Sequence, residues 1–382
     1  MQKKVMVAIS AGVWDGAQHR PHHFMKRAAG DGRTVVYVEP PVTLIAPLKN
    51  KQLLKSWKRW YNGMQQHDEN LFVLSPPPVL PFGNKYRFIN KINQWIISIP
   101  IKKASRQFDG ELELYSFLPS SVDLLRRVNF DSVYYDCVDD HASFTGFIKP
   151  KLVNRLEKEL MGASHVCFAT ARKLLEDRSE WSANLHLVPN GAEFEHFSKV
   201  QEETLLTPYD IDEIPKPVVG FIGGISDWID LRLIEETARA LPSYSFVMIG
   251  PVDTNISHFR GLENVYFLGS KPYKQLPNYI QEFDICLIPF KINELTKSVN
   301  PIKMYEYLSA GKPIISTAMP EVEPFRDVIE VVHSGTEMIE KLVWMMDSKE
   351  EFHSAEKVML RQRVGEENSW DARWERVAGL LR

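Results

Sequence analysis

Residues 298–317, SVNPIKMYEYLSAGKPIIST, combine the signals for a helix start, a helix end and a strand within one stretch. Asn300 suits the N-cap position, and Pro301 suits the first helical position, where its missing N–H costs nothing. Gly311 stands where many helices end in a left-handed residue. We therefore predict a helix from Pro301 to about Ala310, and the apolar run after it predicts a strand.

The start of this predicted helix suits a nucleotide diphosphate. Lys303 and Glu306 are three residues apart, so they share one face of the helix. Free N–H groups, the positive end of the helix dipole and Lys303 favour a phosphate, while Glu306 can accept hydrogen bonds from ribose. An apolar strand over residues 284–290 precedes the helix, so we expect its start at the carboxyl edge of a parallel sheet, where open α/β folds bind ligands. The alternative is a surface helix with a solvated Lys–Glu pair.

The pattern NPxKxYEYLxxGKPxxxT, which follows an apolar strand here, resembles the donor-binding segment of GT-B glycosyltransferases. It is most similar to the large retaining group that contains many bacterial polysaccharide enzymes, including the teichuronic acid type. The resemblance implies an α/β GT-B fold, in which two Rossmann-like doubly wound domains face each other across a cleft and a C-terminal helix packs back on the first domain. It also implies a hexosyltransferase with a UDP-sugar donor, retention of anomeric configuration, and no metal or cofactor, because the nucleotide-sugar is a substrate.

Length and composition support two domains. The chain has 382 residues, of which 44% are hydrophobic and 25% are charged, as in ordinary globular proteins. We predict an N-terminal domain facing the acceptor and the membrane (1–198), a linker (199–216), a nucleotide-sugar-binding domain (217–365) and a returning C-terminal helix (366–382). The motifs GxGxxG and GxxxxGK[ST] do not occur, which disfavours a dehydrogenase or a P-loop enzyme.

A double glycine after an apolar strand adds to the expected donor site, because backbone N–H groups in such a turn can approach a phosphate closely. The expected donor-binding residues are Gly223, Gly224, Lys271, Tyr273, Ser298, Asn300, Lys303 and Glu306. The resemblance implies that Lys271 and Tyr273 lie near the nucleobase, and it puts Ser298 where relatives often carry a glutamate. An Arg and a Lys that many relatives have after the glycine turn are replaced here by a serine and aspartates.

The N-terminal half offers polar side chains after two predicted strands. These are His19, Arg20 and His22 on the acceptor side, and Asp139, Asp140 and His141 as catalytic candidates. The resemblance implies that the loop after the first strand faces the acceptor. The acidic residues follow the apolar strand 132–137, a position suited to proton transfer or acceptor binding. A metal cluster at the histidines and a helix cap at the aspartates are the alternatives.

One region of the chain is strongly basic although the net charge is −3. Between residues 48 and 108 there are eleven Lys and Arg and two acidic residues. The stretches 49–61 (KNKQLLKSWKRWY) and 85–99 (KYRFINKINQWIISI) mix cations with Trp and aliphatic residues, so we expect helices that bind an anionic membrane surface. Pro100 should end or kink the second. Packed core helices are the alternative, and nucleic acid is disfavoured because no binding module accompanies the patch.

The remaining features predict a cytoplasmic protein that is peripheral on the inner face of the cell membrane. Cys137, Cys167 and Cys286 lie in apolar runs without metal-ligand spacing, so we expect buried free thiols and a reducing compartment. No run approaches the ~20 apolar residues of a membrane span.

Two other functions remain open on the sequence. A nucleotide-sugar epimerase could use the same scaffold but would not need the basic amphipathic region. A catalytically silent glycan-binding scaffold would explain the absent Arg–Lys pair. Release of free UDP during turnover would favour the transferase over both.

Overall fold

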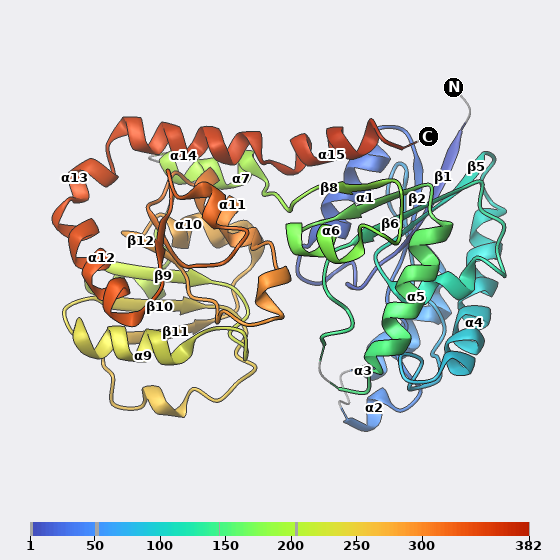
Figure 1. Cartoon of the computed structure of the whole chain (residues 1–382), viewed down its shortest axis with the longest axis horizontal. Helices are drawn as coiled ribbons and strands as arrows, with labels where there is room; N and C mark the ends of the chain where they lie inside the picture. Colours follow the sequence, from blue (N-terminus) through green and yellow to red (C-terminus); the bar gives the residue numbers. More distant parts are fainter. Residues whose placement is uncertain (1–2, 50–52, 145, 203–204, 382) are drawn as a thin grey trace. The chain divides into compact units, whose positions relative to one another are not determined.

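The computed structural model describes residues 3–49, 53–144, 146–202 and 205–381. The chain forms two compact units, each built on its own sheet (Figure 1). Unit 1 comprises Met1–Pro189 and Trp374–Arg382, and unit 2 comprises Asn190–Arg373. None of the helices in the described ranges combines the length and the apolar content needed to cross a membrane.

Unit 1 contains an eight-stranded sheet in the order β3-β4-β2-β1-β5-β6-β7-β8. All neighbours are parallel except β3 and β4. Its strands are β1 (Lys4–Ile9), β2 (Thr34–Val38), β3 (Met64–Asp68), β4 (Leu71–Leu74), β5 (Glu111–Ser116), β6 (Ser132–Cys137), β7 (Val166–Ala169) and β8 (Leu185–Leu187). Its helices include α1 (Arg20–Gly30), α2 (Ala46–Lys49), α3 (Leu53–Arg59), α4 (Arg87–Ser105), α5 (Pro150–Ala163) and α6 (Arg172–Arg178). Strands β1 and β2 are apolar and buried over nearly their whole length, as expected where helices cover both faces of a parallel sheet.

Unit 2 contains a six-stranded parallel sheet in the order β11-β10-β9-β12-β13-β14. Its strands are β9 (Val218–Ile222), β10 (Ser245–Ile249), β11 (Val265–Gly269), β12 (Ile285–Ile288), β13 (Ile314–Thr317) and β14 (Glu330–Val332). Its helices include α7 (Phe194–Phe197), α8 (Tyr209–Asp212), α9 (Leu231–Ala240), α10 (Leu276–Ile280), α11 (Ile302–Ser309), α12 (Gly335–Asp347), α13 (Lys349–Phe352) and α14 (Ala355–Glu367). The strand order reverses between β9 and β12, as in doubly wound folds. The predicted α/β class with two such sheets is confirmed.

The boundary between the units differs from the predicted division at residue 198. Asn190 already belongs to unit 2, because its N–H donates to Asn300 Oδ1 (2.9 Å) and its side chain donates to the Asn300 carbonyl (2.8 Å). Phe197 lies in the core of that unit. The segment predicted as a linker also packs there, since Val200 and Ile211 belong to the same core. Residues 203–204 of that segment lie outside the described residues.

The last helix, α15 (Trp370–Ala378), passes from unit 2 into unit 1. Within unit 1, the Trp374 ring packs edge-to-face on Phe24, with centroids 5.5 Å apart, and Trp374 Nε1 donates to Asp31 (2.6 Å). The C-terminal helix thus returns to the first domain, as expected. An aromatic contact and a charge-assisted hydrogen bond hold it there.

Two helix boundaries differ from the predictions. Helix α11 begins at Ile302, with Pro301 at the N-cap, and Asn300 does not cap it because tertiary hydrogen bonds engage its side chain. Its end is as predicted, with Gly311 in the left-handed region at φ 69°. Helix α4 continues through Pro100 to Ser105, so this proline does not end it.

Gly250 provides a test of the contact between the ends of β9 and β10. Its φ is 150°, and a Cβ there would lie 1.8 Å from the Gly223 carbonyl oxygen. We expect Gly250→Ala to lower the free energy of unfolding by roughly 3 kcal/mol or more, since backbone must move. The control is Gly261→Ala, which also has a positive φ (86°) but no atom within 4 Å of the new Cβ. It should cost only about 1 to 2 kcal/mol. Equal losses in urea unfolding would contradict the close backbone contact.

Candidate functional site

The start of α11 forms a charged site at the carboxyl edge of the second sheet. Lys303 Nζ lies 2.6 Å from Glu306 Oε2, and the Glu306 side chain is almost fully buried while Lys303 is partly exposed. The Tyr307 hydroxyl accepts a hydrogen bond from the Ile222 N–H (2.8 Å) at the end of β9. The glycine turn that follows β9 therefore lies next to α11, as the sequence predicted for a phosphate site.

His196 joins this site although sequence reasoning missed it. Its ring stacks on Tyr273 with centroids 4.8 Å apart, and its Nε2 donates to the Tyr273 carbonyl (3.0 Å). Burial lowers the pKa of His196, and the negative charge of Glu306 opposes that shift. From the predicted donor-binding set, the structure thus pairs Lys303 with Glu306 and stacks Tyr273 on His196, whose pKa responds to the charge of Glu306.

The glycine turn has a packing role that the sequence did not reveal. The Gly223 N–H donates to the Ile249 carbonyl (2.8 Å), so it is not free for a phosphate. A Cβ at Gly223 would lie 2.7 Å from the Phe221 ring. At Gly224 the nearest atom to an added Cβ is on Trp228 at 3.8 Å, which is ordinary contact. For Gly224, the role in phosphate binding stays a prediction.

Three predicted donor-binding residues have structural partners. The Lys271 ammonium forms an ion pair with Asp210 and lies 5.3 Å from the Tyr279 ring centroid. Asn300 is buried, and its Nδ2 donates to the Tyr305 hydroxyl (3.1 Å) and to Glu321 (3.2 Å). Ser298 is buried in a short 3₁₀ turn. The contacts of Lys271 and Asn300 hold the loops together, and the donor-binding role of all three residues stays a prediction.

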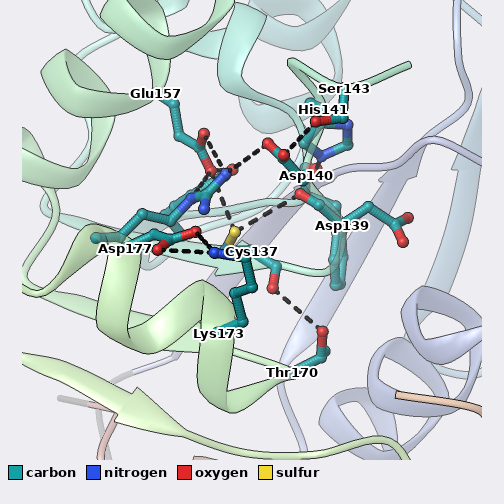
Figure 2. Close-up of polar contacts among 12 residues, drawn as sticks. Cys137, Asp139, Asp140, His141, Ser143, Glu157, Thr170, Lys173 and Asp177 are labelled. Atoms are coloured by element: carbon teal, nitrogen blue, oxygen red, sulfur yellow. Dashed lines mark hydrogen bonds and ion pairs between the residues drawn. The ribbon is translucent and has the colours of Figure 1, made fainter. Parts of the chain in front are cut away.

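The acidic segment after β6 separates into groups with different roles (Figure 2). Arg178 donates to both carboxylate oxygens of Glu157 (2.9 and 3.2 Å) and to Asp140 (3.0 Å). Burial alone would raise the pKa of Asp140, but the hydrogen bond from Ser143 and the Arg178 guanidinium bring it below its ordinary value. Asp140 therefore anchors the loop as an ion-paired carboxylate, and it is a poor base.

Asp139 differs from its neighbour. Its carboxylate points away from Glu157 and Asp140 in Figure 2. Burial, with repulsion from Asp140, raises the pKa of Asp139 to about 7. A carboxylate that titrates near neutrality suits general base catalysis. His141, in contrast, is buried and donates through Nε2 to the Phe117 carbonyl (3.1 Å), and burial lowers its pKa.

The predicted acceptor-side residues lie at the start of α1. Arg20 is buried, and its Nε donates to Asp136 (2.8 Å). His22 is also buried, with Nδ1 accepting from the His19 N–H (3.2 Å) and Nε2 donating to the Val13 carbonyl (3.0 Å). His22 is therefore a neutral imidazole that closes the start of the helix. Arg20 and His22 shape the loop from inside, and the exposed member of the set is His19.

The described residues contain no group of three or more His, Cys, Asp or Glu side chains placed to hold a metal ion. The three cysteines are buried free thiols, as predicted.

Comparison with known proteins bears on this geometry. Residues 231–379 match the family model described as "Glycosyl transferase-like". A protein of Bacillus subtilis (strain 168), TuaH, which is named as a teichuronic acid biosynthesis glycosyltransferase, is 28% identical over 214 residues, covering 50% of this chain and 52% of that protein. The chain thus spans about half the length of the curated relative it matches.

Solved structures share the fold over the whole chain. Sucrose-phosphate synthase from Thermosynechococcus elongatus superposes with a TM-score of 0.75, 12% identity, and coverage of 99% of this chain and 98% of that one. Anabaena HepE in complex with UDP and glucose gives a TM-score of 0.67, 12% identity and 99% coverage of both chains. The chain has the GT-B fold, and its residues 231–379 are similar to the glycosyl transferase-like family. The resemblance inferred from the 298–317 stretch is confirmed.

In this GT-B protein, the two adjacent aspartates provide a test with opposite signs. The pKa of Asp139 is about 7 in the folded protein, against an ordinary value of 3.8. As the pH rises from 3.8 to about 7, the ionisation of Asp139 therefore lowers the free energy of unfolding progressively. Asp139→Asn should therefore raise the free energy of unfolding by roughly 1–3 kcal/mol at about pH 8, and by little near pH 4. Asp140, whose pKa is lowered, should lose stability at about pH 8 when changed to Asn. Urea unfolding at both pH values measures these changes, and a loss of stability in Asp139→Asn at the higher pH would refute the assignment.

Proposed function

We propose that this protein is a glycosyltransferase that moves a sugar from a UDP-sugar to a lipid-linked or growing cell-surface polysaccharide. The observation that carries the proposal is the buried Glu306 carboxylate, paired with Lys303 at the start of α11 beside the glycine turn. The complex of HepE with UDP and glucose supports a UDP-sugar donor, and the name of TuaH supports a polysaccharide product.

The donor would bind unit 2 through two contacts. The N–H groups and positive dipole end of α11, together with Lys303, stabilise the diphosphate, and more strongly as it departs with additional negative charge. Glu306 accepts hydrogen bonds from the ribose hydroxyls, and Tyr273 and His196 lie beside it. In this proposal the diphosphate is stabilised by protein groups without a metal or cofactor, and the resemblance to the retaining group supports retention of configuration.

The acceptor hydroxyl must lose its proton as the new glycosidic bond forms and the bond from the sugar to the diphosphate breaks. Asp139 in unit 1 is a carboxylate with a pKa suited to take that proton near neutrality. Asp140 and His141 would keep its loop in place through their own buried contacts.

Removal of the Glu306 carboxylate tests the donor site. We expect Glu306→Ala to weaken UDP binding ten- to hundredfold, about 1.5 to 3 kcal/mol, because ribose loses its acceptor. The matched control is Glu330→Ala, which breaks another Lys–Glu pair of unit 2, with Lys341, away from α11. Isothermal titration calorimetry with UDP would measure both. Unchanged affinity in Glu306→Ala would remove this residue from the site.

The membrane part of the proposal rests on the outer face of α4. Its exposed residues repeat at helical spacing and mix large apolar side chains with cations: Phe88, Lys91, Ile92, Trp95, Ile99, Lys102 and Lys103. Phe88, Trp95 and Ile99 are 64%, 50% and 54% exposed. The buried face carries Asn90 and Asn93. A helix that exposes large apolar side chains to solvent and buries amide side chains is suited to contact a lipid bilayer with its exposed face. The lysines on that face favour anionic lipids. Residues 50–52 of the other predicted interfacial helix lie outside the described residues.

Charge reversal on this face tests the membrane proposal. Each cation near an anionic bilayer contributes about 1 kcal/mol, so Lys91→Glu with Lys102→Glu should weaken binding roughly 30-fold or more. The control pair, Lys151→Glu with Lys274→Glu, makes the same change in net charge at exposed sites elsewhere. Co-sedimentation with phosphatidylglycerol vesicles gives the readout. Equal binding by the two double variants would show that α4 is not the contact.

A further inference from the structure

A pocket of about 410 Å³ opens at the carboxyl edge of the first sheet, apart from the residues predicted to face the acceptor. Its walls come from the segments that follow four strands: residues 41–46 after β2, 79–84 after β4, Ser120 after β5 and Phe147 after β6. Helix α4 closes one side. All of these segments belong to unit 1. This size and this edge of an α/β sheet are typical of small-molecule binding sites.

The α4 side of the pocket is held rigidly by amide side chains. Asn93 pairs with the backbone of Leu80, accepting from its N–H (3.0 Å) and donating to its carbonyl (2.9 Å). Asn90 donates to the Ser120 carbonyl and to Asp123, both at 2.9 Å. The loop that carries Leu80 is therefore tied to α4 without a ligand, and the pocket is preorganised.

Gln94 is the exception among these amides. It lines the pocket and is 4% exposed, yet its Oε1 has no hydrogen-bond partner among the described residues. Its Nε2 reaches only Asn90 Oδ1, at the long distance of 3.5 Å. A buried acceptor without a partner is costly, so this position is suited to a ligand that supplies a hydroxyl or amide donor.

Thr43, Asn84 and Ser120 also line the pocket, but most of its remaining wall and its rim are apolar. Val79, Ile97 and Phe82 line it, and the Phe82 ring packs edge-to-face on Phe147, with centroids 5.0 Å apart. Large apolar side chains stand exposed on the same segments: Leu44, Ile45, Leu48, Leu54, Phe144 and Phe147. A rim of this kind would not favour a free sugar, but it suits an aliphatic chain that leaves a membrane.

We propose, on the basis of the glycosyltransferase function above, that this pocket binds the lipid-linked acceptor at the junction of its chain and its sugar. The chain lies against the apolar walls and rim, and a sugar hydroxyl donates to Gln94 Oε1. The exposed lysines of α4 hold the same unit at an anionic surface. The occupant is a glycolipid, because a bulk lipid chain without a donor would leave Gln94 unsatisfied.

Binding of simple amphiphiles by the full chain tests this proposal. The probes are n-octyl glucoside at monomeric concentration, glucose, and n-octylphosphocholine, which has the same chain but no hydrogen-bond donor. By titration calorimetry we expect octyl glucoside to bind at least about tenfold more tightly than either of the others, since it alone uses both parts of the pocket. Glucose binding as tightly, or octylphosphocholine binding as tightly, would overturn the proposal in favour of a sugar site or a bulk lipid site.

Two variants locate the binding. Ala46→Trp fills the pocket from α2 and should abolish octyl glucoside binding, whereas Lys151→Trp, at an exposed position of α5 that does not line the pocket, should not. Gln94→Leu should raise the melting temperature, because it removes an unsatisfied buried acceptor, while it lowers octyl glucoside affinity to that of octylphosphocholine. Retained affinity in either Ala46→Trp or Gln94→Leu would refute the site.

UDP binding separates this inference from the proposed function. Both variants should bind UDP like the wild type, because Glu306 and Lys303 belong to unit 2. Wild-type protein that binds UDP but no octyl glucoside would refute the pocket alone. Protein that binds octyl glucoside in the pocket but no UDP would refute the proposed transferase instead.

Discussion

A buried carboxylate within α11, paired with a lysine of the first turn, is the constraint on which the donor site depends. Glu306 is taken out of water within α11, and the Lys303 ammonium three residues earlier compensates its charge. Breaking a buried ion pair by removing one partner is strongly unfavourable, so the two side chains hold each other in place. The hydrogen bond from the Ile222 N–H to Tyr307 fixes the same helix against the end of β9. Together these contacts preserve a positive helix end and a hydrogen-bond acceptor at one edge of the sheet.

The two units use opposite chemistry on similar scaffolds. In unit 2 the carboxyl edge of the sheet presents charge, which suits a nucleotide diphosphate. In unit 1 the corresponding edge presents an apolar pocket with one unsatisfied amide oxygen, beside a helix whose exposed face is apolar and basic. The loops after the strands account for this difference, since the sheets themselves are built from the same kind of buried parallel strands.

Local signals predicted the elements well and the polar partners poorly. Gly311, the Lys303–Glu306 spacing and the apolar strands depend on neighbours in the chain, and the structure has them as expected. Asn300 was misread as a helix cap because its partner Asn190 is 110 residues away. The ion pair of Lys271 with Asp210, 61 residues earlier, was not predicted either. A local sequence pattern does not indicate which residues, far apart in the chain, pair with each other in the fold.

The same reason explains what sequence reasoning missed. His196 was assigned to the first domain with the strand before it, and its approach to Glu306 depends on the fold of unit 2. The pocket of unit 1 collects segments that follow four different strands. Gln94 was missed because only the cations and large apolar residues of α4 entered the prediction, and the burial of its amides depends on packing against other segments of unit 1.

A crystal structure of the protein soaked with UDP would test the donor site most directly. We predict the diphosphate at the first turn of α11, near Lys303, with the ribose hydroxyls on the Glu306 carboxylate. UDP bound elsewhere in unit 2, or absent at saturating concentration, would contradict the proposed glycosyltransferase site.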